Sequence, residues 1–120
     1  IGVEPGPEVI TGSTRLKSGT AQKMVLNMLS TGAMIRLGKV YGNLMVDVKP
    51  TNEKLVRRAI SIVSTAANVS EDESRQALEQ CGFSAKTAIV MLTKGLPAQE
   101  AERRLAENGG IVARALDEED

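Results

Sequence analysis

Hydroxyl and basic side chains are concentrated in one stretch near the start of the sequence, GPEVITGSTRLKSGTAQK, which spans Gly6 to Lys23. Between Thr11 and Thr20 its hydroxyl-bearing and cationic residues are Thr11, Ser13, Thr14, Arg15, Lys17, Ser18 and Thr20. Hydroxyls with one or two cations suffice to hold a phosphomonoester. A helix predicted to follow would add the free N–H groups of its first turn and the positive end of its dipole. The residue types therefore predict a phosphate or sugar-phosphate site, and a polar structural turn is the alternative that they leave open.

The order of residues in this stretch argues against a nucleotide-binding P-loop. The run GSTRLKS places Leu16 directly before Lys17, at the position where a P-loop carries glycine. Glu8 is the only carboxylate beside the loop. We expect it to have a structural role, in which it orients the backbone or a neighbouring cation.

Composition excludes several classes of function. The sequence has no histidine, which removes the commonest general base and most zinc or iron sites, so no metal is expected. Basic and acidic residues balance at 15 each, and Tyr41 and Phe83 are the only aromatic residues. Neither nucleic acid nor a membrane surface is therefore an expected partner. The single Cys81 cannot form an internal disulfide and is expected to be a small buried helix residue.

One long helix is predicted to follow the polar stretch. Ser18 is a plausible N-cap, and the apolar residues that follow lie on most of the helix circumference until the helix ends near Gly38. Such a helix is typical of a protein core, and Gly32 would let another element approach closely. The segment Lys39–Val48 combines a short apolar run with a Tyr-Gly-Asn turn signal and is predicted to be extended.

Shorter helices are predicted for the rest of the chain. A second helix follows Pro50, with Thr51 as its cap and with a buried stripe of Leu55, Ala59, Ile62, Val63 and Ala66. Beyond Asn68 the caps are the Ser70–Glu73 capping box, Ser84 with Gly95, and Pro97 at a first helical position, and Ile111–Leu116 adds a last turn. The acidic tail from Asp117 to Asp120 is predicted to fray. We place a domain boundary near Ala67–Val69.

The first ten residues, IGVEPGPEVI, can supply only one or two short extended pieces. Because one strand cannot form a sheet, we expect the chain to be part of a longer protein whose other strands lie upstream. The sequence contains neither a run of about twenty apolar residues nor a leader pattern. The expected location is the cytoplasm.

Two long runs of residues carry a resemblance to a known family. GPEVITGSTRLKSGTAQKMVLNMLSTG and LGKVYGNLMVDVKPTNEKL resemble the bacterial N-acetylmuramic acid 6-phosphate etherases, and the first run also resembles the signature of glucokinase regulatory proteins. KTAIVML and RRLAENGG extend the likeness to essentially the whole chain. The resemblance implies a mainly α chain. Residues 1–67 would be the C-terminal part of an α/β sugar isomerase-type (SIS) domain with its signature loop at 6–23, and residues 68–120 a small three-helix bundle resembling a ubiquitin-associated (UBA) domain.

The same resemblance implies an activity. Family members cleave the lactyl ether of N-acetylmuramic acid 6-phosphate, giving N-acetylglucosamine 6-phosphate and D-lactate in peptidoglycan recycling. They do so by acid/base elimination of lactate and addition of water to a ring-opened sugar intermediate, without metal or organic cofactor. Their catalytic glutamates lie upstream of the signature, so no catalytic residue is expected in this chain, and the chain alone should be inactive.

The resemblance also assigns binding residues. Ser13 and Arg15 fall in the part of the signature that approaches the sugar phosphate, and Thr14, Lys17 and Ser18 are weaker candidates. Arg15 could instead bridge subunits, since these enzymes resemble homodimers with composite sites. Two other readings stay open: a non-catalytic sugar-phosphate-binding regulator, and a protein-binding role for the helical tail.

Overall fold

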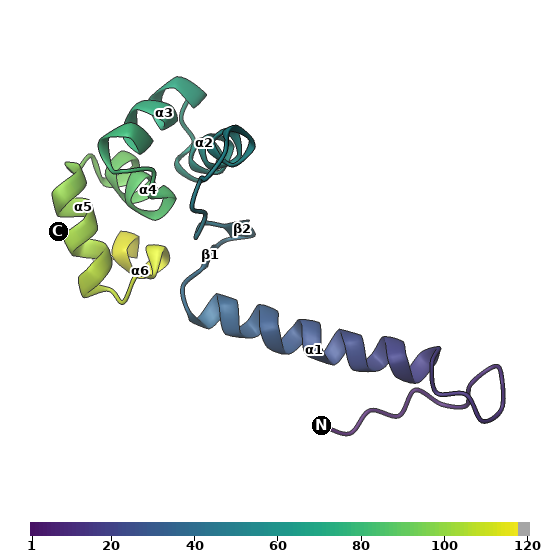
Figure 1. Ribbon diagram of the computed structural model, residues 1–120. Coiled ribbons are helices and arrows are strands. Elements are labelled where there is room, and N and C mark those ends of the chain that lie inside the picture. Colours follow the sequence, from purple (N-terminus) through teal and green to yellow (C-terminus); the bar gives the residue numbers. More distant parts are fainter. Residues whose placement is uncertain (118–120) are drawn as a thin grey trace. The chain divides into compact units, whose positions relative to one another are not determined.

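A computed structural model describes residues 1–117 of the chain (Figure 1). Contacts within it divide the chain into two units, which are Ile1–Arg36 and the part from Leu37 onward. The elements are α1 (Lys17–Arg36), β1 (Val40–Tyr41), β2 (Leu44–Met45), α2 (Glu53–Ala67), α3 (Glu71–Gln80), α4 (Ala85–Lys94), α5 (Ala98–Glu107) and α6 (Val112–Asp117). The prediction of a mainly helical chain is confirmed. Most of the predicted acidic tail, residues 118–120, lies outside the described part.

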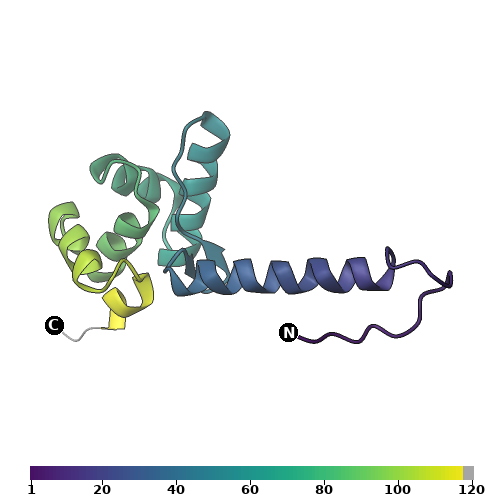
Figure 2. The same ribbon diagram turned by 60° about the horizontal axis from the view of Figure 1, so that its bottom comes forward.

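The first unit consists of α1 and an irregular segment, residues 1–16, that runs back beside the helix (Figures 1 and 2). The expectation of a core helix is wrong for this chain as it stands, because no residue of α1 is buried. Met28 is 62% exposed and Leu29 is 56% exposed. The cluster of buried side chains instead lies in the second unit, between Val46 and Ala115.

A two-residue hairpin follows α1. Val40 pairs with Met45 and Tyr41 with Leu44, so the extended segment predicted at Lys39–Val48 is a short antiparallel pair. Gly42 opens the loop with φ +58°, a conformation that glycine adopts without steric cost. Gly38, with φ +68°, is also required by space, because a Cβ there would lie 2.9 Å from the Ile111 side chain. The end of α1 predicted near Gly38 is confirmed.

The N-cap of α2 is Asn52, not Thr51 as predicted. The Asn52 side-chain oxygen accepts a hydrogen bond from the backbone N–H of Leu55 at 3.0 Å. This bond satisfies one of the helix's orphan donors.

We therefore expect Asn52→Ala to lower the free energy of unfolding of the second unit by about 1 kcal/mol. Thr51→Ala is the matched control and should leave it within about 0.5 kcal/mol of the parent chain. Urea denaturation checks both variants. An equal loss in the two would show that the Asn52 bond contributes nothing.

The remaining helix ends largely follow the predictions. The Ser70–Glu73 capping box is present, the Ser84 side chain caps α4, and Gly95 closes α4 in the left-handed conformation. Pro97 is one position earlier than predicted, since it is the N-cap of α5 rather than its first residue. Local hydrogen bonds over three or four residues therefore set most of these boundaries.

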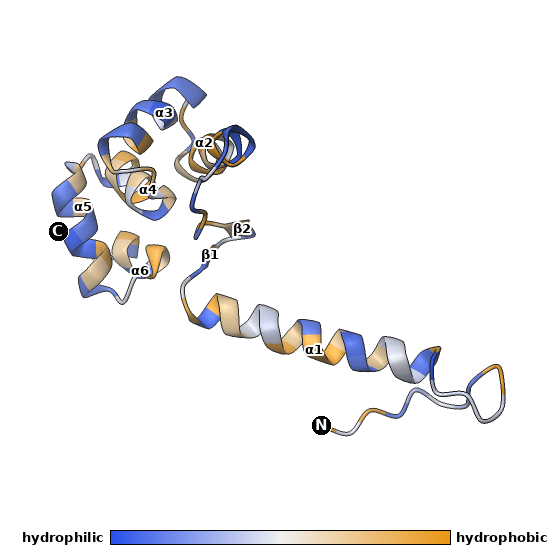
Figure 3. Cartoon of the chain, in the orientation of Figure 1, coloured by the Kyte–Doolittle hydropathy of each residue, from blue (hydrophilic) through white to orange (hydrophobic). Residues whose placement is uncertain are grey.

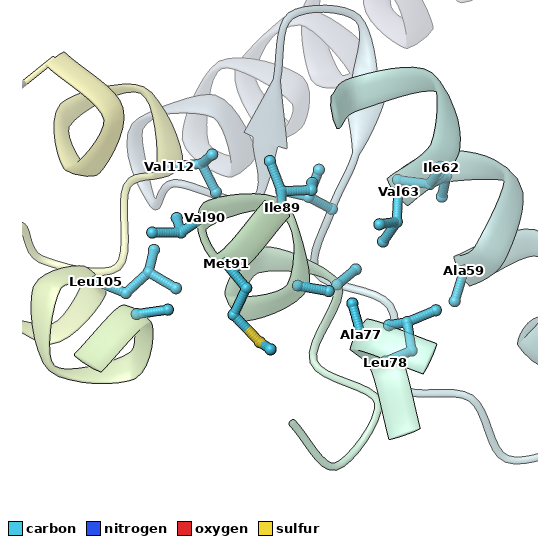
Figure 4. Packing of buried hydrophobic residues seen from close by; sticks show 14 of the residues in the cluster. Ala59, Ile62, Val63, Ala77, Leu78, Ile89, Val90, Met91, Leu105 and Val112 are labelled. Carbon is cyan, nitrogen blue, oxygen red and sulfur yellow. The ribbon is translucent and has the colours of Figure 1, made fainter. Parts of the chain in front are cut away.

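The core of the second unit is built around α4, which packs against α2, α3, α5 and α6 (Figure 4). Ile89 is fully buried at its centre, and Val90 lies toward Leu105 and Val112. On α2, Ala59, Ile62 and Val63 are buried as predicted, whereas Leu55 and Ala66 are half-buried. Ile60, which the predicted stripe omitted, is only 2% exposed.

This packing places α2 with the helices that follow it. Because α2 contacts both α3 and α4, the compact unit begins at Leu37, and the boundary predicted near Ala67–Val69 does not coincide with a break between packed units. The physical reason is that the apolar side of α2 completes the core of α3 and α4. The assignment of residues 1–67 to a SIS-type domain and of 68–120 to a UBA-like bundle stays a prediction.

Candidate anion-binding site

The predicted binding residues lie in the loop before α1 and in the first turn of that helix. The loop turns at Ile10–Ser13, where the Ser13 N–H donates to the Ile10 carbonyl at 3.1 Å and Gly12 has φ +85°. The Ser13 side-chain oxygen accepts a long hydrogen bond, 3.4 Å, from the backbone N–H of Arg15. The five predicted residues are neighbours in the sequence, and this turn leads them into the start of α1.

Glu8 occupies the end of α1. One carboxylate oxygen accepts from the Lys17 N–H at 3.0 Å and the other accepts from the Ser18 N–H at 3.1 Å. A carboxylate is favoured there because it meets both orphan donors and the positive end of the helix dipole. The structural role expected for Glu8 is thus present, and the predicted N-cap role of Ser18 is wrong, since the helix begins at Lys17 and Glu8 caps it.

This cap reduces the number of backbone hydrogen-bond donors that are available to an anion at the loop. The backbone donors of Lys17 and Ser18, which were expected to face a phosphate, are already bonded to a carboxylate. An anion at the loop therefore cannot use these two donors while Glu8 holds them, and it must lie far enough from Glu8 to limit repulsion.

The side chains themselves are accessible. Thr14, Arg15 and Lys17 are exposed, and Ser13 and Ser18 are half-buried. Within residues 1–117 neither Arg15 nor Lys17 forms an ion pair. Beside the loop lies an open groove of about 440 Å³, lined by Pro5, Leu16, Lys17, Thr20, Ala21 and Met24. The loop therefore presents cations and hydroxyls at the edge of a largely apolar surface.

The pKa of Glu8 is lowered, first by the hydrogen bond from the Lys17 N–H and then by that from the Ser18 N–H. A group whose pKa is lower in the folded chain stabilises the fold above its unfolded-state pKa, and that contribution is lost as the pH falls through the folded value. The cap of α1 is therefore acid-sensitive.

We expect an NMR titration to show Glu8 titrating at a lower pH than the same carboxyl in the urea-unfolded chain, with the amide protons of Lys17 and Ser18 shifting along with it. Glu8→Gln should abolish that pH-dependent amide shift, and the matched Glu4→Gln should not. Equal midpoints for Glu8 in the folded and unfolded chains would contradict the cap.

A second charged cluster joins the hairpin to α4. The Asp47 carboxylate lies 2.9 Å from Lys39 Nζ and 3.9 Å from Lys86 Nζ, and Lys86 Nζ donates to the Gly110 carbonyl at 3.0 Å. The hydrogen bond from Lys39 is the main cause of the lowered pKa of Asp47. Because both lysines are engaged by oxygens of this unit, we assign the cluster a structural role.

Neither the single cysteine nor a metal-binding cluster offers a further reactive site in the described part of the chain. The half-buried Cys81 thiol lies 3.3 Å from the Ser84 carbonyl oxygen, and burial raises the pKa of this thiol, which disfavours the nucleophilic thiolate. Among residues 1–117 no group of three histidine, cysteine, aspartate or glutamate side chains could hold a metal ion. No helix in this described part is long and apolar enough to span a bilayer.

Known proteins resemble this chain along nearly its whole length. Residues 42–87 match the C-terminal lid domain of glucokinase regulatory protein. The N-acetylmuramic acid 6-phosphate etherase of Cutibacterium acnes is 60% identical over 116 residues, which cover 97% of this chain and 38% of that relative. The Klebsiella aerogenes etherase is 60% identical over 111 residues, covering 92% and 37%. The Aliivibrio fischeri etherase is 58% identical over 114 residues, covering 95% and 38%. The chain thus spans little more than a third of the length of these relatives.

Proposed function

Because this chain belongs to the N-acetylmuramic acid 6-phosphate etherase family, we propose that it forms the C-terminal portion of a lyase that cleaves the D-lactyl ether of N-acetylmuramic acid 6-phosphate. The products would be N-acetylglucosamine 6-phosphate and D-lactate. The observation that carries the proposal is 60% identity over 97% of the chain, which includes the whole polar loop. The proposed setting is peptidoglycan recycling in the cytoplasm.

The polar loop supplies the substrate-phosphate contacts in this proposal. Arg15 and Ser13 are the principal contacts, and Thr14, Lys17 and Ser18 are secondary ones. Exposure of the Arg15 guanidinium and the absence of an ion pair for it within residues 1–117 support this role, since an unpaired fork of donors can bind phosphate in a bidentate manner. Glu8 holds the end of α1 and keeps the phosphate on the side-chain face of the loop.

Proton transfer is assigned to carboxylates outside these 120 residues, in the part of the longer protein that the match does not span. A pair of glutamates with separated pKa values can remove the proton beside the ether and protonate the departing lactate oxygen, which leaves an unsaturated, ring-opened sugar. Addition of one water to its double bond then gives N-acetylglucosamine 6-phosphate, so no metal or organic cofactor is required. Residues 1–67 would belong to a SIS-type domain and residues 68–120 to a UBA-like bundle, in a homodimer.

The test is lactate release from N-acetylmuramic acid 6-phosphate. The full-length protein that contains this chain should release D-lactate, and the 120-residue chain alone should release none. Absence of activity in the full-length protein would contradict the proposed function. Turnover by the isolated chain would show that an acid among these residues performs catalysis.

A regulatory sugar-phosphate-binding role is the second candidate. It is favoured by the match of residues 42–87, which contain β2, α2 and α3, to the C-terminal lid domain of glucokinase regulatory protein. A regulator would bind the sugar phosphate without consuming it. Calorimetry on the full-length protein with lactate measured in the same sample separates the two: binding with turnover supports the lyase, and binding without turnover supports the regulator.

A further inference from the structure

A cavity of about 460 Å³ lies wholly within the second unit, between two connections that are distant in the sequence. One wall is the segment from Val46 to Pro50, which leads from β2 to α2, and the other is the segment from Gly82 to Lys86, which leads from α3 into α4. Figure 3 shows apolar and hydrophilic residues following one another along the connection from β2 to α2. The cavity therefore combines apolar and charged walls.

Basic side chains outnumber acidic ones around this cavity. Lys49, Lys86 and the Asp47 carboxylate line it, and Lys39 Nζ lies 2.9 Å from the same carboxylate. The pKa of Asp47 is lowered first by the hydrogen bond from Lys39 and further by the charges of Lys86 and Lys49, so all three lysines lie close by. Lys49 is exposed and forms no ion pair within residues 1–117. The cavity therefore carries positive charge that Asp47 does not balance.

Backbone donors in the same wall have no partner. Ala85 is 1% exposed, and no hydrogen bond in the described part of the chain involves its backbone N–H or that of Lys86. The Ser84 side chain, which caps α4, accepts instead from the N–H of Thr87. A buried N–H without a partner is unfavourable, and an acceptor that enters the cavity would satisfy it. In α1 the donors at the same two helix positions are both bonded to the Glu8 carboxylate.

Phe83 completes the cavity in a conformation that costs energy. Its φ is +61°, in the left-handed region that a bulky residue rarely adopts. Its N–H donates to the Leu78 carbonyl at 2.7 Å, and the half-buried residue lines the cavity with Val48. Residues held in such conformations are concentrated at binding sites. The backbone strain therefore places an aromatic side chain beside the lysines.

We propose that this cavity binds a small organic carboxylate. The charged group lies near Lys49 and accepts from the open N–H groups of Ala85 and Lys86, and the carbon chain lies against the apolar wall. Asp47 disfavours a dianion such as phosphate, because its own carboxylate repels a second negative charge more strongly than a single one. Inorganic phosphate also has no carbon chain to bury. The cavity contains no residue of the polar loop, so this site does not depend on the proposed function.

NMR of the isotope-labelled 120-residue chain tests the proposal, with acetate, butyrate and inorganic phosphate as separate probes at constant ionic strength. Butyrate should shift the amide signals of Lys49, Ala85 and Lys86 and saturate them in the millimolar range. Acetate should bind about fivefold more weakly, because its shorter chain buries less apolar area. Phosphate that saturates these signals as readily as butyrate would overturn the proposal, and so would the absence of a saturable shift with either acid.

A charge-matched pair of variants tests the role of the free lysine. Lys49→Gln should weaken butyrate binding about three- to fivefold, since it removes the cation that has no partner of its own. Lys23→Gln removes the same charge from the exposed surface of α1 and should leave the affinity unchanged. Equal affinities in the two variants would contradict a specific contact with Lys49.

Asp47→Asn separates ligand binding from structural support. This substitution removes the ion pairs that join the hairpin to α4, so the melting temperature should fall. It also frees Lys39 and Lys86 and removes the repulsion, so butyrate should bind about three- to fivefold more tightly. A cluster with a structural role alone predicts no gain in affinity. Weaker or unchanged butyrate binding in Asp47→Asn would therefore overturn the proposal.

Discussion

Replacing Arg15 with alanine in the full-length protein should lower kcat/KM for N-acetylmuramic acid 6-phosphate by about 10- to 100-fold, mainly through a higher KM. The expected size follows from the loss of charged hydrogen bonds to phosphate, each of which contributes about 1.5–3 kcal/mol. Arg15 is exposed in this chain, and no ion pair within residues 1–117 involves it, so the substitution removes few contacts of the fold itself. Steady-state kinetics of lactate release measures the effect.

Two companion variants define what the Arg15 result means. Arg15→Lys keeps the charge but loses the planar fork, so it should recover only part of the activity if the contact with phosphate is bidentate. Arg75→Ala removes an exposed arginine of α3, in the other unit, and should leave kcat/KM unchanged. Unchanged kinetics in Arg15→Ala would remove this residue from the site. A loss of activity that follows dimer dissociation in sedimentation would assign Arg15 to a subunit contact instead.

The largest stability effect is expected at Ile89. Its side chain is fully buried on α4, the helix that α2, α3, α5 and α6 surround, so Ile89→Ala deletes three carbons at the centre of the core. The cost of such a cavity is about 2–5 kcal/mol, which corresponds to a fall in melting temperature of about 10 °C or more in a unit of this size. The physical basis is lost burial together with a void that neighbouring side chains fill incompletely.

Tyr41 offers a selective probe for this measurement. It is the only tyrosine in a sequence without tryptophan, and it packs against the same core, so its fluorescence reports the second unit and not α1. Leu37→Ala is the matched control because Leu37 is 63% exposed, and it should change the free energy of unfolding by less than about 0.5 kcal/mol. Equal stability of Ile89→Ala and the parent chain would show that α4 is not the centre of the core.

Much of the second unit was predictable from the sequence because its signals are local. The Ser70–Glu73 capping box, the Ser84 cap and the Gly95 stop each depend on hydrogen bonds within a few residues, and the structure contains all three. The residue types do not identify the N-cap when two adjacent residues are both of a capping type. Thr51 and Asn52 are both capping types, and only the geometry of the first turn selected Asn52.

The candidate site shows the same division. Residue types alone predicted hydroxyls and cations gathered before a helix. The structure has some of them in the loop before α1 and the others in the first turn of that helix. The engagement of the first two helix donors by Glu8 could not be predicted in this form, because the carboxylate is separated from Lys17 by nine positions and the turn at Ile10–Ser13 brings them together. Whether those donors remain for a ligand is therefore a property of the folded loop.

The sequence by itself determined the helices, most of their caps and the polar loop, since each of these is written in residue types at short spacing. Only the tertiary structure decided which faces are buried. It placed Ile60 and the side of α2 in one core with α3 and α4, and it brought Gly38 against Ile111. No residue of α1 is buried. Burial depends on which distant surfaces meet, and the apolar pattern of α1 specifies that it needs a partner without specifying which one.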